Sequence, residues 1–375
     1  MTMAVLNTWL TPEVVAFLTA WLVASVIVLT QRWHGKWSVD SLEGIQKFHT
    51  QPTPRVGGIA IVIGAVSAWG VVPQADVGAL LGPLLLAGLP ALVFGLTEDL
   101  TKRVGVGARL LATMACGVMG YAMTGMAITH ANLVGLDWLL GFTVVSVAFT
   151  AFAVAGVANA VNIIDGMNGL AGGSVVIMLA GLGAISLQLG DPQLAHVCVI
   201  LAAAVAGFLL VNWPLGRIFL GDGGAYCAGF SLAWVSVLLL ARHPEVSAWA
   251  PLLACGYPIL EVLFSMQRRR RRGLSVSAPD RLHLHSLVKK RVVARWFPGA
   301  GNLARNSITG ALMWLAALVP VGLAIFRPTD TAFLVLALLV CALLYTAVYA
   351  RLTQFSWCIG AATMRAARAD QSQDD

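Results

Sequence analysis

Apolar residues follow one another in long runs along most of this chain of 375 residues. A helix needs about 20 predominantly apolar residues to cross the hydrocarbon core of a bilayer. Eleven runs come close to that length, and polar segments separate them. The pattern predicts an all-α, polytopic membrane protein with about 11 transmembrane helices. The predicted spans lie near 13–31, 56–72, 79–96, 106–127, 141–160, 173–189, 194–212, 224–241, 248–266, 307–326 and 331–350.

Composition agrees with this class and excludes an ordinary soluble protein. The chain is 58% hydrophobic and 11% charged, whereas about a quarter of the residues in a soluble domain are charged. We expect a single transmembrane catalytic domain over residues 1–355, with a large cytoplasmic loop at 267–306 inside it. The polar tail at 356–375 is expected to be disordered.

Basic residues divide the loops into two groups and predict the orientation. With eleven spans, alternate loops share one side of the membrane, and 22 of the 24 Lys and Arg residues fall on one side. The opposite side holds only Arg242 and Arg327. Cytoplasmic loops collect positive charge, so the basic side is predicted to face the cytoplasm. The expected partner of these residues is the lipid bilayer, and no nucleic acid is expected.

Five polar segments on the predicted cytoplasmic side carry candidate chemistry. The first segment runs from Lys47 to Gly58, where two prolines favour an extended turn and Lys47, His49 and Arg55 offer charge to a phosphate. An ordinary basic loop is the alternative interpretation. The second segment is the acidic pair Glu98-Asp99, which Lys102, Arg103 and Arg109 follow. Such a pair suits Mg²⁺ binding or acid–base work, and a helix-end charge cluster is the alternative.

The third segment, 159–173, gives the sharpest signal. Asn159, Asn162, Asp165 and Asn168 recur every three residues and lead into a glycine-rich turn. Residues three apart share one helix face, and glycines let a backbone approach phosphate closely. A polar connector between two helices explains this spacing less well.

The fourth segment, 212–224, places Asp222 between glycines, with Phe219 available to stack on a base. A tight turn would have the same composition. The fifth segment opens with Arg268–Arg272, which is typical of an anchor on anionic lipid. Asp280, Arg281, His283 and His285 follow, and we interpret them as the rim of a sugar or pyrophosphate pocket.

In this order, the segments resemble the polyprenyl-phosphate N-acetylhexosamine-1-phosphate transferase superfamily, glycosyltransferase family 4, from about residue 45 to about residue 290. The bacterial undecaprenyl-phosphate GlcNAc-1-phosphate transferases are the nearest type. The resemblance implies an enzyme of the bacterial inner membrane that transfers a sugar-1-phosphate from a UDP-sugar, such as UDP-GlcNAc, to undecaprenyl phosphate. UMP is released, and the product starts a cell-surface polysaccharide such as O-antigen. A homodimer and Mg²⁺, with Mn²⁺ as an alternative, are also implied.

The resemblance also assigns roles by position. It implies that Asp222 and Asn162 hold the metal ion, and that Phe219 and Asn168 lie near the uridine. Lys47, Arg55 and Arg109 become candidate phosphate clamps, and Asp99 is expected to accept a proton from the lipid phosphate or to position it. The remaining expected catalytic residues are Glu98, Asp165, His283 and His285, and the remaining expected substrate-binding residues are His49, Asn159, Asp280 and Arg281.

Three positions depart from the family pattern. Glu98 stands where the family usually has Asp, Ser286 replaces the last histidine of its His-x-His-His motif, and Glu261 replaces an Asp within the ninth span. An ionisable residue such as Glu261 inside a span indicates function or helix pairing. These changes leave the sugar open. The alternative function is a transporter or flippase, which would need polar residues through the membrane depth.

Overall fold

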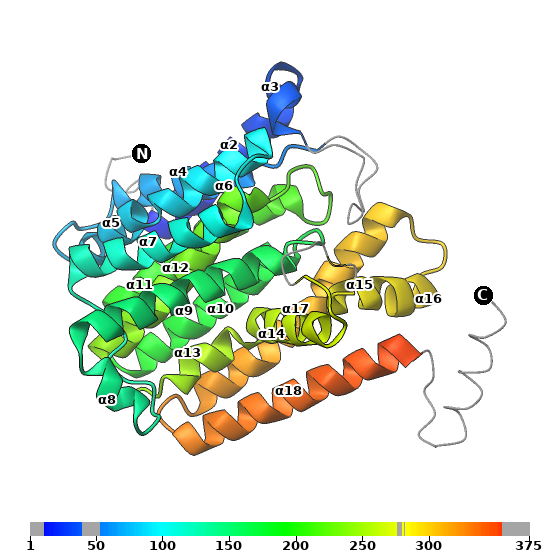
Figure 1. Ribbon diagram of the computed structural model, residues 1–375. Helices are drawn as coiled ribbons and strands as arrows, with labels where there is room; N and C mark the ends of the chain where they lie inside the picture. The colour runs from blue at the N-terminus through cyan, green and yellow to red at the C-terminus, as the bar shows by residue number, and fades with distance from the viewer. Residues whose placement is uncertain (1–10, 40–52, 276–279, 281, 355–375) are drawn as a thin grey trace, which may run out of the picture.

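The computed structural model describes residues 11–39, 53–275, 280 and 282–354 (Figure 1). These residues form helices and no β-strand, so the predicted all-α class is confirmed for this part of the chain. In the first half, the helices are α2 (Pro12–Leu29), α3 (Gln31–Ser38), α4 (Gly57–Trp69), α5 (Val77–Ala87), α6 (Leu89–Thr101), α7 (Val106–Thr124), α8 (Leu136–Leu140), α9 (Thr143–Ile164) and α10 (Leu170–Gln188). In the second half they are α11 (Pro192–Asn212), α12 (Gly221–Arg242), α13 (Trp249–Ala254), α14 (Gly256–Arg271), α15 (Leu284–Val288), the π-helical turn η1 (Lys289–Val293), α16 (Ala294–Trp296), α17 (Asn302–Phe326) and α18 (Thr331–Gln354).

The predicted count of eleven spans is not confirmed. Among the described residues, eight helices are long and apolar enough to cross a bilayer. The pair α5 and α6 is a ninth candidate, which bends by 41° at Gly88. Pro90 follows this break, and its missing N–H is tolerated only in a first helical turn. The helix α4 has 13 residues, and the predicted span 248–266 is divided at Cys255 between α13 and α14.

Apolar side chains on the outer helices point away from the protein. Trp21, Leu22 and Leu29 of α2 and Leu336 and Leu343 of α18 are all exposed. Soluble monomers rarely expose apolar surface on this scale. The outward faces of these helices are therefore lipid-facing, and the chain is a multi-pass membrane protein.

Helix α12 forms the centre of the bundle and sets the position of the site. It is buried along nearly its whole length and packs against α4, α6 and α9. Glycines allow these close approaches, since a Cβ on Gly95 would lie 2.5 Å from the Cα of Gly223 and a Cβ on Gly58 would overlap the backbone of Gly224. At about 1.5 Å per residue, a helix of this length spans roughly the hydrocarbon thickness of a bilayer. Its first and last turns therefore mark opposite surfaces of the membrane.

The packing of α4 on α12 predicts a strong effect of a single methyl group. We expect Gly58→Ala to lower the free energy of unfolding by about 1–3 kcal/mol, because the new Cβ overlaps the backbone atoms of α12. Gly156→Ala is the matched control, since Gly156 is an exposed residue inside α9 with no atom within 4 Å of its Cβ position. The control should be neutral or stabilising, and thermal unfolding in detergent measures both. Equal unfolding temperatures in the two variants would contradict this packing.

Candidate active site

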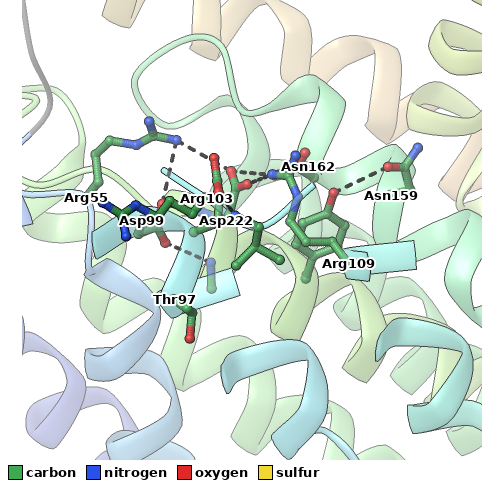
Figure 2. A network of polar contacts seen from close by, with 12 residues as sticks. Arg55, Thr97, Asp99, Arg103, Arg109, Asn159, Asn162 and Asp222 are labelled. Carbon is green, nitrogen blue, oxygen red and sulfur yellow. Dashed lines mark hydrogen bonds and ion pairs between the residues drawn. The ribbon is translucent and has the colours of Figure 1, made fainter. Parts of the chain in front are cut away.

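The carboxylate of Asp99 holds the start of α12 (Figure 2). Asp99 is in the last turns of α6 and is only 2% exposed. The backbone N–H of Asp222 donates to its Oδ1 at 3.0 Å, and the N–H of Gly223 donates to its Oδ2 at 2.9 Å. The N–H groups in the first turn of a helix lack intrahelical partners and attract anions. Asp99 therefore joins α6 to the N-terminus of α12 and fixes the direction of the next side chain.

The carboxylate of Asp222 lies where three other chain segments meet, as Figure 2 shows. Asn162 donates from Nδ2 to its Oδ1 at 3.1 Å, and Nη2 of Arg55 lies 3.4 Å from the same oxygen. Nη1 of Arg109 donates to Oδ2. Nη2 of Arg55 is also 3.6 Å from Oδ1 of Asp99, so this guanidinium lies between both carboxylates. We call Arg55, Asp99, Arg109, Asn162 and Asp222 the Asp222 cluster.

Backbone pairing brings Arg55 to this cluster. The N–H of Phe219 donates to the carbonyl of Pro54 at 2.8 Å, and the N–H of Gly57 donates to the carbonyl of Phe219 at 3.0 Å. Gly221, two residues after Phe219, has a φ of +73°. A side chain there would overlap the carbonyl of Arg55 and approach Oδ2 of Asp99, so the turn requires glycine.

Helix α9 contributes the two asparagines on one face, as their spacing predicts. Asn162 contacts Asp222, whereas Oδ1 of Asn159 accepts a hydrogen bond from the hydroxyl of Tyr226 at 3.4 Å. The guanidinium of Arg109 lies 5.8 Å from the centroid of the Tyr226 ring. The sequence interpretation missed Tyr226, although it follows Asp222 by four residues and therefore shares its helix face.

Asp165 follows the last residue of α9. The residue as a whole is partly exposed to solvent, but the surrounding protein buries its carboxyl group. This burial raises the pKa of Asp165 to about 7. The nearby carboxylate of Asp99 raises the pKa further, and the guanidinium of Arg55 and the N–H of Gly221 act in the opposite direction. The side chain thus belongs to the surroundings of the Asp222 cluster and titrates near neutrality.

Two predicted residues point away from the Asp222 cluster. Oε2 of Glu98 accepts the N–H of Val104 at 2.8 Å, which closes the connection between α6 and α7. Nδ2 of Asn168, a buried residue, donates to Oγ of Ser307 in α17 at 3.2 Å. Lys47, His49 and Arg281 lie outside the described residues, as does the predicted disordered tail from 356.

The segment that carries His283 and His285, here called the histidine segment, packs against the turn that follows Asp165. His283 pairs through Nδ1 with Oε1 of Glu261 at 3.0 Å, and the rings of His283 and His285 are parallel with centroids 5.4 Å apart. A Cβ on Gly166 would lie 2.6 Å from Nε2 of His285, so this ring packs directly on the turn after Asp165. Asp280 pairs with Arg268 of α14 and not with the Asp222 cluster.

The burial of His285 predicts an acid-sensitive fold. Burial lowers the pKa of His285 from 6.5 to about 4, although the carboxylate of Glu261 opposes the shift. Between these values the unfolded chain binds a proton that the folded chain does not, so stability falls as pH falls from 6.5 towards 4. His285→Gln cannot titrate there, and should lose less stability than the parent between pH about 7 and about 5. Thermal unfolding at both pH values measures this difference, and an identical loss in both proteins would contradict it.

Comparison with known proteins gives one consistent result. The family model for glycosyl transferase family 4 matches residues 81–240, a range that includes Asp99, Arg109, Asn162 and Asp222. A probable undecaprenyl-phosphate N-acetylglucosaminyl 1-phosphate transferase of Bacillus subtilis is 28% identical over 277 residues, which cover 72% of this chain and 76% of the relative.

Two further relatives have related names. An undecaprenyl-phosphate alpha-N-acetylglucosaminyl 1-phosphate transferase of Escherichia coli is 27% identical over 65% of this chain and 67% of its own length. A decaprenyl-phosphate N-acetylglucosaminephosphotransferase of Mycobacterium tuberculosis is 27% identical over 78% of both chains. With the predicted motifs, the family model and these relatives confirm the resemblance to glycosyl transferase family 4.

Proposed function

We propose that this membrane phosphotransferase moves a sugar-1-phosphate of the N-acetylhexosamine type from a UDP-sugar to undecaprenyl phosphate. UMP and an undecaprenyl-diphosphate sugar are the products, which start a cell-surface polysaccharide. The observation that carries the proposal is the Asp222 cluster, in which two arginines and an asparagine face one carboxylate at the start of a buried helix. The names of the three relatives support the carrier lipid and the sugar class.

The reaction that we propose is a direct displacement at phosphorus. An oxygen of the lipid phosphate attacks the phosphorus that carries the sugar, and the bond from that phosphorus to the oxygen of UMP breaks. Little covalent chemistry falls to the protein in such a transfer, so placement and charge stabilisation supply most of the rate. Among the described residues of the Asp222 cluster, Arg55 and Arg109 are the cations for the phosphates. Asp222 contacts both guanidinium groups, and Asp99 also contacts Arg55.

The charge of the cluster favours a divalent cation as cofactor. In the described structure, Arg55 and Arg109 are engaged by Asp99 and Asp222, so an incoming diphosphate meets little uncompensated positive charge. No three His, Cys, Asp or Glu side chains of the described residues converge as a metal cage. Mg²⁺ commonly uses one or two protein oxygens, waters and substrate phosphates instead. Asp222 and the amide oxygen of Asn162 would hold Mg²⁺, or Mn²⁺, and the bound ion supplies charge neutralisation of the diphosphate.

The proposed location is the bacterial inner membrane, with the Asp222 cluster facing the cytoplasm. Asp222 is in the first turn of α12, whereas Arg242 is in its last turn and pairs with Asp191 at 2.6 Å. The cluster therefore lies at one end of the bundle. The predicted eleven-span division assigns 22 of the 24 Lys and Arg residues to the loops on this side, and the positive-inside rule supports the proposal that this side faces the cytoplasm.

The first experiment measures UMP release by the purified protein in detergent with undecaprenyl phosphate and UDP-GlcNAc, beside UDP-GalNAc and a 6-deoxy sugar donor. Asp99→Asn and Asp222→Asn should each slow UMP release by about a hundredfold or more, because each removes a preorganised charge. Asp76→Asn is the control, since Asp76 is an exposed residue in a predicted loop on the opposite side. Full activity of Asp222→Asn would contradict its role, and a parent protein that releases no UMP would favour transport.

The raised pKa of Asp165 predicts the pH dependence. Because its pKa is about 7 and not 3.8, the carboxyl group of Asp165 is mostly protonated below neutral pH and mostly ionised above it. If the ionised group serves the reaction, the rate rises as pH increases through about 7. Asp165→Asn should be slower and lack this rise, which rate measurements on both sides of neutrality can test. A parent-like pH profile in Asp165→Asn would assign the titration to another group, such as the lipid phosphate with its second pKa of about 6.

A further inference from the structure

One face of α14 holds the histidine segment in a defined register. Glu261, Ser265 and Arg268 follow at spacings of four and three residues, and therefore share this face. Oγ of Ser265 donates to Oδ2 of Asp280 at 2.6 Å, and Nη1 of Arg268 donates to the carbonyl of Leu282 at 2.6 Å. We call Glu261, Ser265 and Arg268 the α14 stripe.

Glu261 is the deepest member of the α14 stripe. It is 1% exposed, and its Oε1 accepts the N–H of Leu284 at 3.0 Å, at the start of α15. The same oxygen lies 3.0 Å from Nδ1 of His283. A hydroxyl or amide would accept the backbone hydrogen bond with a smaller desolvation cost than a carboxylate. The contact with His283 gives the carboxylate a role that a simple helix cap would not need.

This contact indicates that Nδ1 of His283 carries a proton. An ionised carboxylate accepts hydrogen bonds and donates none, so the ring nitrogen that faces it carries the proton. With the proton on Nδ1, Nε2 of the neutral ring is an acceptor. An acceptor nitrogen is suited to a substrate group that carries a proton, such as a sugar hydroxyl or amide N–H, and not to an ionised phosphate oxygen.

The second histidine has different surroundings. His285 is 3% exposed, and its ring fills the space beside Gly166 while it lies parallel to the ring of His283. This packing connects the histidine segment to the turn after Asp165. His283, whose side chain is 12% exposed, is the more accessible ring of the two.

We propose that Glu261 is a positioning residue that keeps the proton of His283 on Nδ1, so that Nε2 of His283 accepts a hydrogen bond from a hydroxyl or amide of the donor sugar. His285 is then a packing residue and does not contact substrate. The assignment rests on the proposed function for the identity of the substrate. The tautomer of His283 follows from the resting structure alone and can be tested separately.

The tautomer is measured by nitrogen resonance spectroscopy of the full-length protein in detergent with ¹⁵N-labelled histidine, and His283→Gln identifies the signals. We expect a protonated Nδ1 in the parent and in Glu261→Gln, whose amide oxygen still accepts a hydrogen bond. Glu261→Met removes the acceptor, and the proton of His283 should then no longer favour Nδ1 over Nε2. A proton on Nε2 of His283 in the parent, or an unchanged tautomer in Glu261→Met, would overturn the proposal.

Kinetics test the consequence for the substrate. Glu261→Met should raise the KM for the UDP-sugar by about tenfold to a hundredfold, the usual range for residues that orient a functional histidine, and Glu261→Gln should restore most of the loss. In a His283→Gln background, Glu261→Met should have no additional effect on this KM. Additive effects of the two substitutions would overturn the proposal.

Ser265→Ala is the matched control, because it removes the hydrogen bonds of Ser265 with Asp280 and Arg268 and leaves the contact between Glu261 and His283. It should lower the unfolding temperature without changing the KM for the UDP-sugar. An equal rise in KM would assign the effect of Glu261 to the stability of the segment and overturn the proposal. A parent protein without transfer activity would refute the proposed function, whereas the resonance measurement would still decide the tautomer.

Discussion

The site depends on the hydrogen bonds between the buried carboxylate of Asp99 and the N-terminus of α12. Asp99 accepts the N–H groups of the second and third residues of α12, at 3.0 and 2.9 Å, and thereby joins two helices that are far apart in the sequence. Only glycine fits at position 221, because a Cβ there would overlap the carbonyl of Arg55. The small residues on α4 and α6 then allow the rest of α12 to pack. Without these hydrogen bonds, neither the direction of the Asp222 side chain nor its contacts with Arg55 and Arg109 would be fixed.

The same arrangement supports the proposed anionic substrate at this end of the bundle. Two guanidinium groups and a helix N-terminus converge on the carboxylates, and the surroundings are mostly apolar. Electrostatic interactions are stronger in such surroundings than in water. Because Asp99 and Asp222 offset the charge of both arginines, the proposed diphosphate would need the added charge of a divalent cation, which Asp222 and Asn162 would hold. Preorganised charge of this kind is the main contribution that a protein can make to phosphoryl transfer.

The sequence contained the main features of the site, because charge and spacing are local properties. The one-sided distribution of basic residues and the three-residue spacing of Asn159 and Asn162 predicted a shared polar region. In the structure, Arg55, Arg109 and Asn162 contact Asp222. Adjacent residues in a helix point about 100° apart, which is why Asp99 enters the cluster while Glu98 bonds to Val104. A pattern of residue types cannot choose between two such neighbours.

Other features depend on tertiary contacts that the sequence does not encode locally. The contact between Glu261 and His283 joins residues 22 positions apart across a polar loop, and the direction of Asn168 depends on Ser307 in α17. The apolar pattern alone also did not determine the number of membrane-spanning helices. Breaks at Gly88 and Cys255 divide apolar runs that look continuous, since prolines near both breaks remove backbone donors without changing the average hydropathy.

The central claim is that this site transfers a phosphorus atom together with the sugar. The most direct test supplies the purified protein and undecaprenyl phosphate with UDP-GlcNAc labelled at the phosphorus next to the sugar. We expect this label to move into the lipid product and unlabelled UMP to be released. Labelled UDP with an unlabelled lipid product would mean that the bond to the sugar breaks instead, and would contradict the account.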